Sequence, residues 1–245
     1  MKKIATMLCA MLLASSVALA AGPGPFYAKG SMYCVPGCWN ADGGNLLSLA
    51  SGVWSGSVVC DNNSVPNPSF PGRHEFKIAN LDWSESYSPW CNLWVHTYMG
   101  EVVYYTLDTN VYADGWLPAQ DIVWTDHYAP PGTTFSVIGS APETGSWGTD
   151  TPANLIGTIW TRVLTIATPG AYEAKFRATG TWDIMNIGSE GAGAPCGANL
   201  GYTTTVDNTD VKFEFNSATG RARVSVLGPT PTLNTTWGKV KTLYR

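Results

Sequence analysis

Short runs in which apolar and polar residues alternate recur along the chain, and glycine, proline or asparagine bounds most of them. Residues 52–59 and 157–166 show this alternation, which is the period of a half-buried strand. Trp54 and Trp160 stand in the middle of these runs, where a sandwich core buries an aromatic ring. No segment after the first twenty residues carries a sustained helical period. The pattern therefore predicts an all-β fold.

The chain also resembles itself at an offset of about a hundred residues, which indicates a duplicated unit. Five segments of the first half recur in the same order in the second half: 26–32 and 135–141, Trp39 and Trp147, 52–59 and 157–166, 71–78 and 169–176, 102–107 and 211–216. Each unit has the size of an immunoglobulin-like sandwich. We expect two tandem immunoglobulin-like β-sandwich domains, one over 21–128, including a linker with Pro118, and one over 129–228. Expected core members of the second are Phe135, Val137, Trp160, Val163 and Phe213.

The two ends of the chain differ from these units. Lys2 and Lys3 precede an apolar run that ends at Ala18-Leu19-Ala20, which predicts a signal peptide over 1–20 that is cleaved after Ala20. The mature protein is then secreted, either extracellular or periplasmic, without membrane insertion. The tail over 229–245 is basic, and it is expected to form either a sorting or docking tag or one short packed helix.

Composition narrows the classes of function. Charged residues make up 13% of the chain and the net charge is −4, whereas the sequence contains 11 Trp, 11 Tyr and 26 Gly. Such a chain has no basic field that would attract nucleic acid. The low charge and the many aromatic residues also exclude a disordered acidic chain and a helical bundle. We therefore expect a protein that works by aromatic contact.

Cysteine usage agrees with export. Four cysteines of the first half are disulfide candidates, and three pairings among them remain open: Cys34, Cys38, Cys60 and Cys91. A zinc site is the rival interpretation, but Cys34-x-x-x-Cys38 has no second closely spaced pair. Cys196 is then the odd cysteine, either a free thiol or a link for self-association.

The repeated pattern of Gly-Ser, Trp, an alternating strand, Pro-Gly-x-Tyr-Glu-x-Lys-Phe and Gly-x-Trp resembles starch- and glycogen-binding modules. These include the glycogen-binding domain of the AMP-activated kinase beta subunit, pullulanase-associated modules and surface starch-binding proteins. The resemblance implies an immunoglobulin-like sandwich that holds α-glucan against paired aromatic rings, with a lysine beside them. By matching position, the implied ligand-binding residues are Trp147, Lys175 and Trp182 in the second unit and Trp39, Lys77 and Trp83 in the first.

Pyranose rings present C–H faces that stack on indole, and their hydroxyls need polar partners, so these residue types suit a sugar. The alternative is that the tryptophans are core and the lysines are solvated. The first unit is one residue shorter between Lys77 and Trp83 than the second is between Lys175 and Trp182. A slip of one residue exchanges the faces of a strand, so the second unit is the better candidate. The roles of Trp90, Trp94, Trp116 and Trp124 stay open between a second patch and packing.

Signals for catalysis are weak. The three histidines lie far apart in sequence, and no nucleophile elbow, metal motif or phosphate-binding loop is present. Asp82, Asp183 and Glu190 are loop acids that we interpret as solvated, and Asp207 to Asp210 is interpreted as a polar turn rather than a calcium site. We expect a binding protein and not an enzyme, with no cofactor or metal, whose partner is a polysaccharide or oligosaccharide. The alternative is a structural, self-assembling cell-surface protein built of the same repeats.

Overall fold

The computed structural model of the chain describes residues 24–33, 39–41, 45–62, 72–87, 92–192 and 197–229. Within these residues the chain forms eighteen β-strands and one short 3-10 helix, η1 (Pro142–Thr144). The fold class is therefore all-β, as predicted. No helix in these ranges is long and apolar enough to cross a membrane. Several predictions fall outside the described residues: the signal peptide, the tail from residue 230, Trp90, and the cysteines Cys34, Cys38, Cys91 and Cys196.

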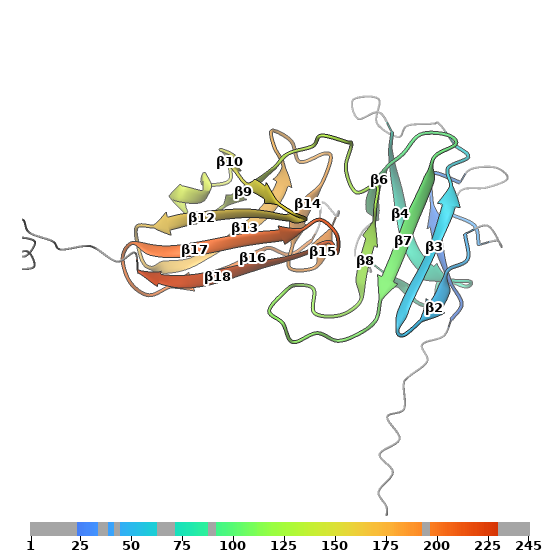
Figure 1. The fold of residues 1–245 in the computed structure, drawn as a ribbon, viewed down its shortest axis with the longest axis horizontal. Helices are drawn as coiled ribbons and strands as arrows, with labels where there is room; N and C mark the ends of the chain where they lie inside the picture. Colours follow the sequence, from blue (N-terminus) through green and yellow to red (C-terminus); the bar gives the residue numbers. More distant parts are fainter. Residues whose placement is uncertain are drawn as a thin grey trace, which may run out of the picture.

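Two antiparallel sheets build the first half of the molecule (Figure 1). In one sheet the central strand pairs with three others: β4 (Arg73–Asn80) with β1 (Phe26–Gly30), β5 (Ser86–Tyr87) and β6 (Leu93–His96). The second sheet has the order β2 (Ser48–Ala50), β3 (Val53–Val59), β7 (Val102–Asp108) and β8 (Ile122–Thr125).

The second half repeats this plan. One sheet is centred on β13 (Gly170–Ala178), which pairs with β9 (Phe135–Gly139), β14 (Asn186–Gly188) and β16 (Leu200–Thr204). Two short strands extend it, β10 (Thr151–Pro152) on β9 and β15 (Gly191–Ala192) on β14. The facing sheet has the order β11 (Asn154–Ile156), β12 (Ile159–Ile166), β17 (Thr209–Asn216) and β18 (Arg221–Pro229).

The two halves match in strand order and in register. Trp54 lies opposite Leu107 between β3 and β7, and Trp160 lies opposite Phe215 between β12 and β17. Gly30 and Gly139 end the first strand of each half, and each pairs with the strand that carries the predicted lysine. The internal similarity of the sequence thus corresponds to a repeated topology. The boundaries of two separate domains stay a prediction.

Each half encloses its own hydrophobic cluster between its sheets, because alternate residues of every strand point inward. Trp54 meets Phe26 edge-on at 5.1 Å between ring centroids, and Trp160 meets Phe135 at 5.3 Å, so both tryptophans pack against the cores as predicted. The prediction that Val163 belongs to the core is wrong. Trp160 and Ile166 occupy the inward phase of β12, and Val163, an odd number of residues away from both, faces outward with 48% of its surface exposed.

Strand β8 corrects the expected linker. The segment around Pro118 was expected to connect two sandwiches, but Ile122–Thr125 pairs with β7 as an edge strand of the first half. Its Val123 packs into the first cluster, whereas the neighbouring Trp124 packs into the second cluster. Successive side chains of a strand point to opposite faces, so this one strand contributes to both cores.

Further contacts tie the halves together. Leu117 and Ala222 exchange two backbone hydrogen bonds, of 2.7 and 2.8 Å. The guanidinium of Arg221, only 8% exposed, donates to both carboxylate oxygens of Asp114 and to the carbonyls of Trp116 and Pro118. Figure 1 shows β6 and β8 on the side of the first half that faces the second. The loop between β7 and β8 is thereby anchored on β18.

Candidate functional site

Pro142 and Gly145 fix the conformation of the loop that carries Trp147. Pro142 begins η1, and Gly145 ends it at φ 85°, where its N–H donates to the carbonyl of Pro142. A Cβ on Gly145 would lie 1.8 Å from the carbonyl oxygen of Thr149, so no other residue fits there. The chain then turns back, and the N–H of Trp147 donates to the carbonyl of Gly139 at 2.8 Å. Trp147 is therefore fixed beside the end of β9.

Trp182 lies in the turn between β13 and β14, close to Trp147. The carboxylate of Asp150 holds this turn by accepting the N–H of Gly180 at 2.7 Å. The two indole rings have centroids 6.4 Å apart and are inclined by 36°. Trp182 is 37% exposed and Trp147 is partly buried. The predicted pair of the second half is thus brought together at the surface.

A cation supports the outer ring of this pair. The guanidinium carbon of Arg177 lies 4.7 Å from the centroid of the Trp182 ring, and its Nε donates to Asp150 at 2.7 Å. Arg177 is 8% exposed, so the ion pair with Asp150 is mostly shielded from water. One carboxylate therefore fixes both the turn and the cation.

The first half builds the same arrangement. The N–H of Trp39 donates to the carbonyl of Gly30, and the N–H of Trp83 donates to the carbonyl of Asn80. The ring centroids of Trp39 and Trp83 are 6.2 Å apart, with an inclination of 45°. Trp83 is 41% exposed, so the shorter spacing in this half does not turn its ring inward.

Here the cation comes from a different strand. Lys29 of β1 places its Nζ 4.3 Å from the centroid of the Trp83 ring and donates to the carbonyls of Asn80 and Leu81. It is 1% exposed. Burial lowers the pKa of the Lys29 ammonium, and the nearby Asp82 opposes that shift in part. Both halves thus hold a buried cation against the exposed tryptophan, although β1 supplies it in one and β13 in the other.

Three of the four tryptophans have left-handed backbone conformations. The φ angles of Trp39, Trp83 and Trp147 are 68°, 64° and 62°. A bulky residue in this region is unusual and costs about 1–3 kcal/mol, which the surrounding structure must offset. The same strained backbone at equivalent positions of both halves marks these loops as functional candidates.

The structure gives Lys175 a different neighbour from the one expected. Lys175 is 7% exposed, and its ammonium donates to Oδ1 of Asn186 at 3.3 Å and to the carbonyl of Gly197. Burial lowers its pKa, and Glu190 opposes the shift. Lys77 lies opposite Lys29 in register and is partly buried. A role of Lys175 or Lys77 in binding a ligand stays a prediction.

Sequence reasoning missed the cations beside the rings. Arg177 follows Lys175 by two residues and so lies on the same face of the strand, a signal that strand periodicity offers. Lys29 approaches Trp83 from a strand that lies far away in sequence, and its contact depends on the pairing of β1 with β4. No local pattern indicates such a contact.

The structure also locates several other residues that the sequence singled out. Trp94 and Trp124 are buried, and Trp116 lies against the guanidinium of Arg223 at 4.4 Å, so these three pack at the junction of the halves. Cys60 is a free thiol here, 1% exposed, which donates to the carbonyl of Asn62 at 3.1 Å. The disulfide prediction thus stays a prediction. Among the described residues, no group of three His, Cys, Asp or Glu side chains could hold a metal ion.

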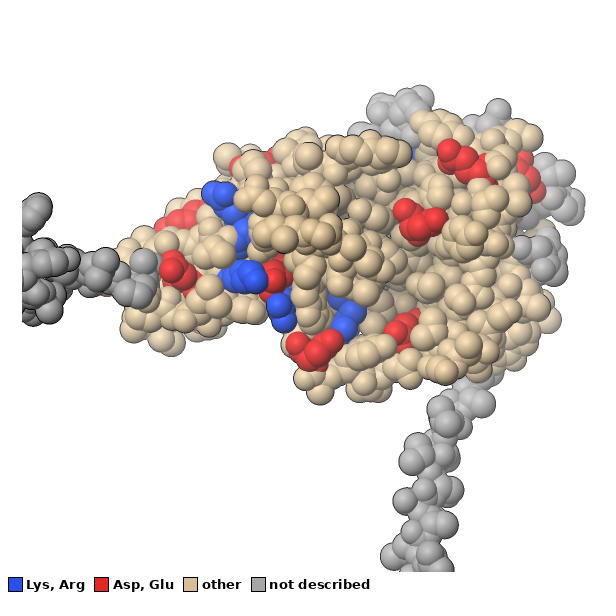
Figure 2. Space-filling model, viewed as in Figure 1, with Lys and Arg blue, Asp and Glu red and all other residues tan. Residues whose placement is uncertain are grey.

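Charged side chains are few on one face of the molecule. On the face drawn in Figure 2, Lys and Arg side chains gather over the second half and the junction, and most of the remaining surface is uncharged. Neither a protein-family model nor a curated protein matches the chain.

Proposed function

We propose that the protein is a non-enzymatic carbohydrate-binding protein that recognises α-glucan, such as starch, glycogen or maltooligosaccharide, through its two tryptophan pairs. The observation that supports this most strongly is the repetition of the pair. Trp39–Trp83 and Trp147–Trp182 have similar separations and inclinations, and each has a buried cation beside the exposed ring.

The chemistry of each pair suits a sugar polymer. Two inclined indoles offer a shallow apolar surface to the C–H faces of neighbouring pyranose rings. Their loops are held by backbone hydrogen bonds, so little freedom remains to be lost on binding. Arg177 and Lys29 are committed to protein partners and lie over one face of the exposed ring, so they hold that ring in place for a sugar to contact.

The proposal is tested with the mature chain and maltoheptaose in isothermal titration calorimetry, together with affinity electrophoresis in glycogen. We expect Trp147→Ala with Trp182→Ala to remove one binding site per chain, and Trp39→Ala with Trp83→Ala to remove the other. Trp116→Ala is the matched control, because it deletes an indole outside both pairs. Absence of binding in the wild-type protein would refute the proposal, as would binding that all four tryptophan substitutions together leave unchanged.

A second candidate is self-assembly into a cell-surface structure. It is favoured by the apolar edge strands: Leu49 on β2 is 54% exposed, and Leu155 and Ile156 on β11 are 52% and 68% exposed. Exposed apolar edges are templates for pairing with another chain. Light scattering with and without reductant distinguishes the two candidates. A carbohydrate-binding protein that does not self-associate stays monomeric in both conditions, whereas a self-assembling protein forms larger species.

A further inference from the structure

A cleft lies at the junction of the two halves, and none of the four paired tryptophans lines it. Its volume is about 590 Å³. One side is formed by the segments around β6 and after β8, and the opposite side by Leu155, Trp160 and Ser217 of the second half. A neighbouring hollow of about 410 Å³ shares Asp126, Tyr128 and Ser217 with it, so the groove continues along the junction. Junctions of this kind are common ligand sites.

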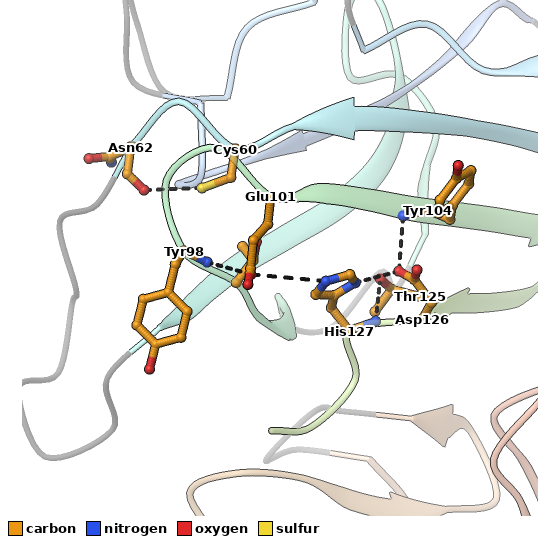
Figure 3. A network of polar contacts seen from close by, with 9 residues as sticks. Cys60, Asn62, Tyr98, Glu101, Tyr104, Thr125, Asp126 and His127 are labelled. Carbon is orange, nitrogen blue, oxygen red and sulfur yellow. Dashed lines mark hydrogen bonds and ion pairs between the residues drawn. The ribbon is translucent and has the colours of Figure 1, made fainter. Parts of the chain in front are cut away.

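A chain of three titratable side chains crosses one wall of the cleft (Figure 3). His127 lies between two carboxylates, with Nδ1 2.6 Å from Oδ1 of Asp126 and Nε2 4.0 Å from Oε2 of Glu101. Both acids are held in place: Asp126 accepts the N–H of Tyr104 at 2.9 Å, and Glu101 accepts the N–H of Tyr98 at 2.8 Å. The two carboxylate side chains remain 44% and 45% exposed. They can therefore accept hydrogen bonds from a ligand.

The carboxylates of Glu101 and Asp126 give the lining of the cleft its negative charge. Among the described residues that line it, none is Lys or Arg. The hydroxyls of Thr133 and Ser217 donate to the carbonyls of Pro130 and Thr158, so they are committed to protein acceptors. A ligand in this cleft thus meets two half-exposed carboxylates with His127 between them, and no Lys or Arg side chain among the described residues.

Aromatic rings and a buried polar atom complete the lining. Tyr98, Tyr128 and Trp160 contribute aromatic surface. His96 also lines the cleft; it is 7% exposed, its Nε2 pairs with the carbonyl of Ile184, and its Nδ1 has no hydrogen-bond partner among the described residues.

We propose that this cleft is a second binding site and that its ligand carries a protonated primary amine. An ammonium group donates three hydrogen bonds and is attracted by carboxylates and by aromatic faces. At the tryptophan pairs, Lys29 and Arg177 already lie over the exposed rings, so those ring faces are not open to an ammonium group. An amine is therefore selected in the cleft and disfavoured at the pairs.

Glucosamine and glucose form the matched probes, since they differ in one ammonium group. The mature chain is titrated with each at neutral pH, and binding is followed by NMR chemical shifts. We expect glucosamine to bind at least about tenfold more tightly than glucose, the factor that corresponds to one charge-assisted hydrogen bond. Glu101→Gln with Asp126→Asn should abolish this preference, and both substitutions preserve side-chain volume and an acceptor oxygen.

The control variant, Trp147→Ala with Trp182→Ala, should keep the preference for glucosamine and lose affinity for maltoheptaose. Equal binding of the two sugars by the wild-type chain would overturn the proposal, and so would a preference that survives in the Glu101→Gln, Asp126→Asn variant. Failure of maltoheptaose binding alone would refute the α-glucan proposal and leave the amine site standing.

Discussion

Trp124 lies in a sheet of the first half, but replacing it with alanine should destabilise the second half of the molecule. The indole belongs to β8, an edge strand of the first half, but it stacks on Tyr128 at 4.6 Å and meets Phe215 of the second core edge-on at 6.1 Å. It also covers Gly220, where a Cβ would lie 2.3 Å from a carbon of the ring. Only 6% of Trp124 is exposed.

The expected magnitude follows from this burial. A buried aromatic side chain removes about 150–250 Å² from water, and at about 25 cal/mol per Å² this amounts to roughly 4–6 kcal/mol. Alanine retains part of that contact, and deletion of buried Trp or Phe typically costs about 3–5 kcal/mol. We expect a loss in the free energy of unfolding of about 3–5 kcal/mol for Trp124→Ala.

Urea denaturation of residues 21–245 measures the total loss of stability, and hydrogen exchange with mass spectrometry shows which strands lose protection. Peptides from β17 should lose protection together with peptides from β7. Trp116→Ala is the control, because its indole packs on Arg223 at the rim of the junction. A loss below about 1 kcal/mol, the range of a surface substitution, would refute the reasoning, as would exchange that rises only in the first half.

Two further predictions concern single contacts. Trp147→Gly should be more stable than Trp147→Ala by about 1 kcal/mol, because both substitutions delete the ring but only glycine adopts a φ of 62° without strain. Thermal unfolding compares the two variants. Equal stability would contradict the strain argument. Asp114→Asn should lower stability at neutral pH, because the hydrogen bond from Arg221 lowers the pKa of Asp114. At a pH above the ordinary pKa of an aspartate, about 3.9, the lowered pKa means that the ionised carboxylate stabilises the fold. This contribution disappears as the pH falls through the lowered pKa. Urea midpoints of wild type and variant should therefore converge in acid, and a gap that persists there would refute the assignment.

Much of the fold could be predicted because strand periodicity and internal similarity are local signals. The alternation in 52–59 and 157–166 marked β3 and β12, and the matched segments anticipated the matched strand order. Val163 was misassigned because β12 carries apolar residues in both phases of the strand, so the sequence does not reveal which phase faces inward. Strand β8 was missed because it has only four residues and both of its faces are buried, so it shows no alternation.

The tryptophan pairs and the cleft also differ in how far the sequence could predict them. The tryptophans of each pair could be found because they recur at matched places in a repeated pattern. The cleft could not be found, because Glu101 and His127 belong to the first half and Trp160 to the second, and they line one cleft only through the packing of the halves. Lys175 shows a further limit, since a residue type at the right position does not reveal where its side chain is buried.

Under the α-glucan proposal, the strand shared between the cores also fixes how the two tryptophan pairs are presented to a long polymer. Since β8 contributes to both clusters and Arg221 anchors the preceding loop, the two tryptophan pairs cannot swivel independently. A flexible tether would let each pair search for its own segment, with an effective concentration set by the length of the tether. Here the span and the relative direction of the pairs are set by the fold. A chain whose curvature fits that span gains avidity from both pairs, whereas one of different curvature occupies a single pair. If the pairs bind α-glucan as proposed, the junction would make binding depend on the shape of the polymer as well as on its sugar chemistry.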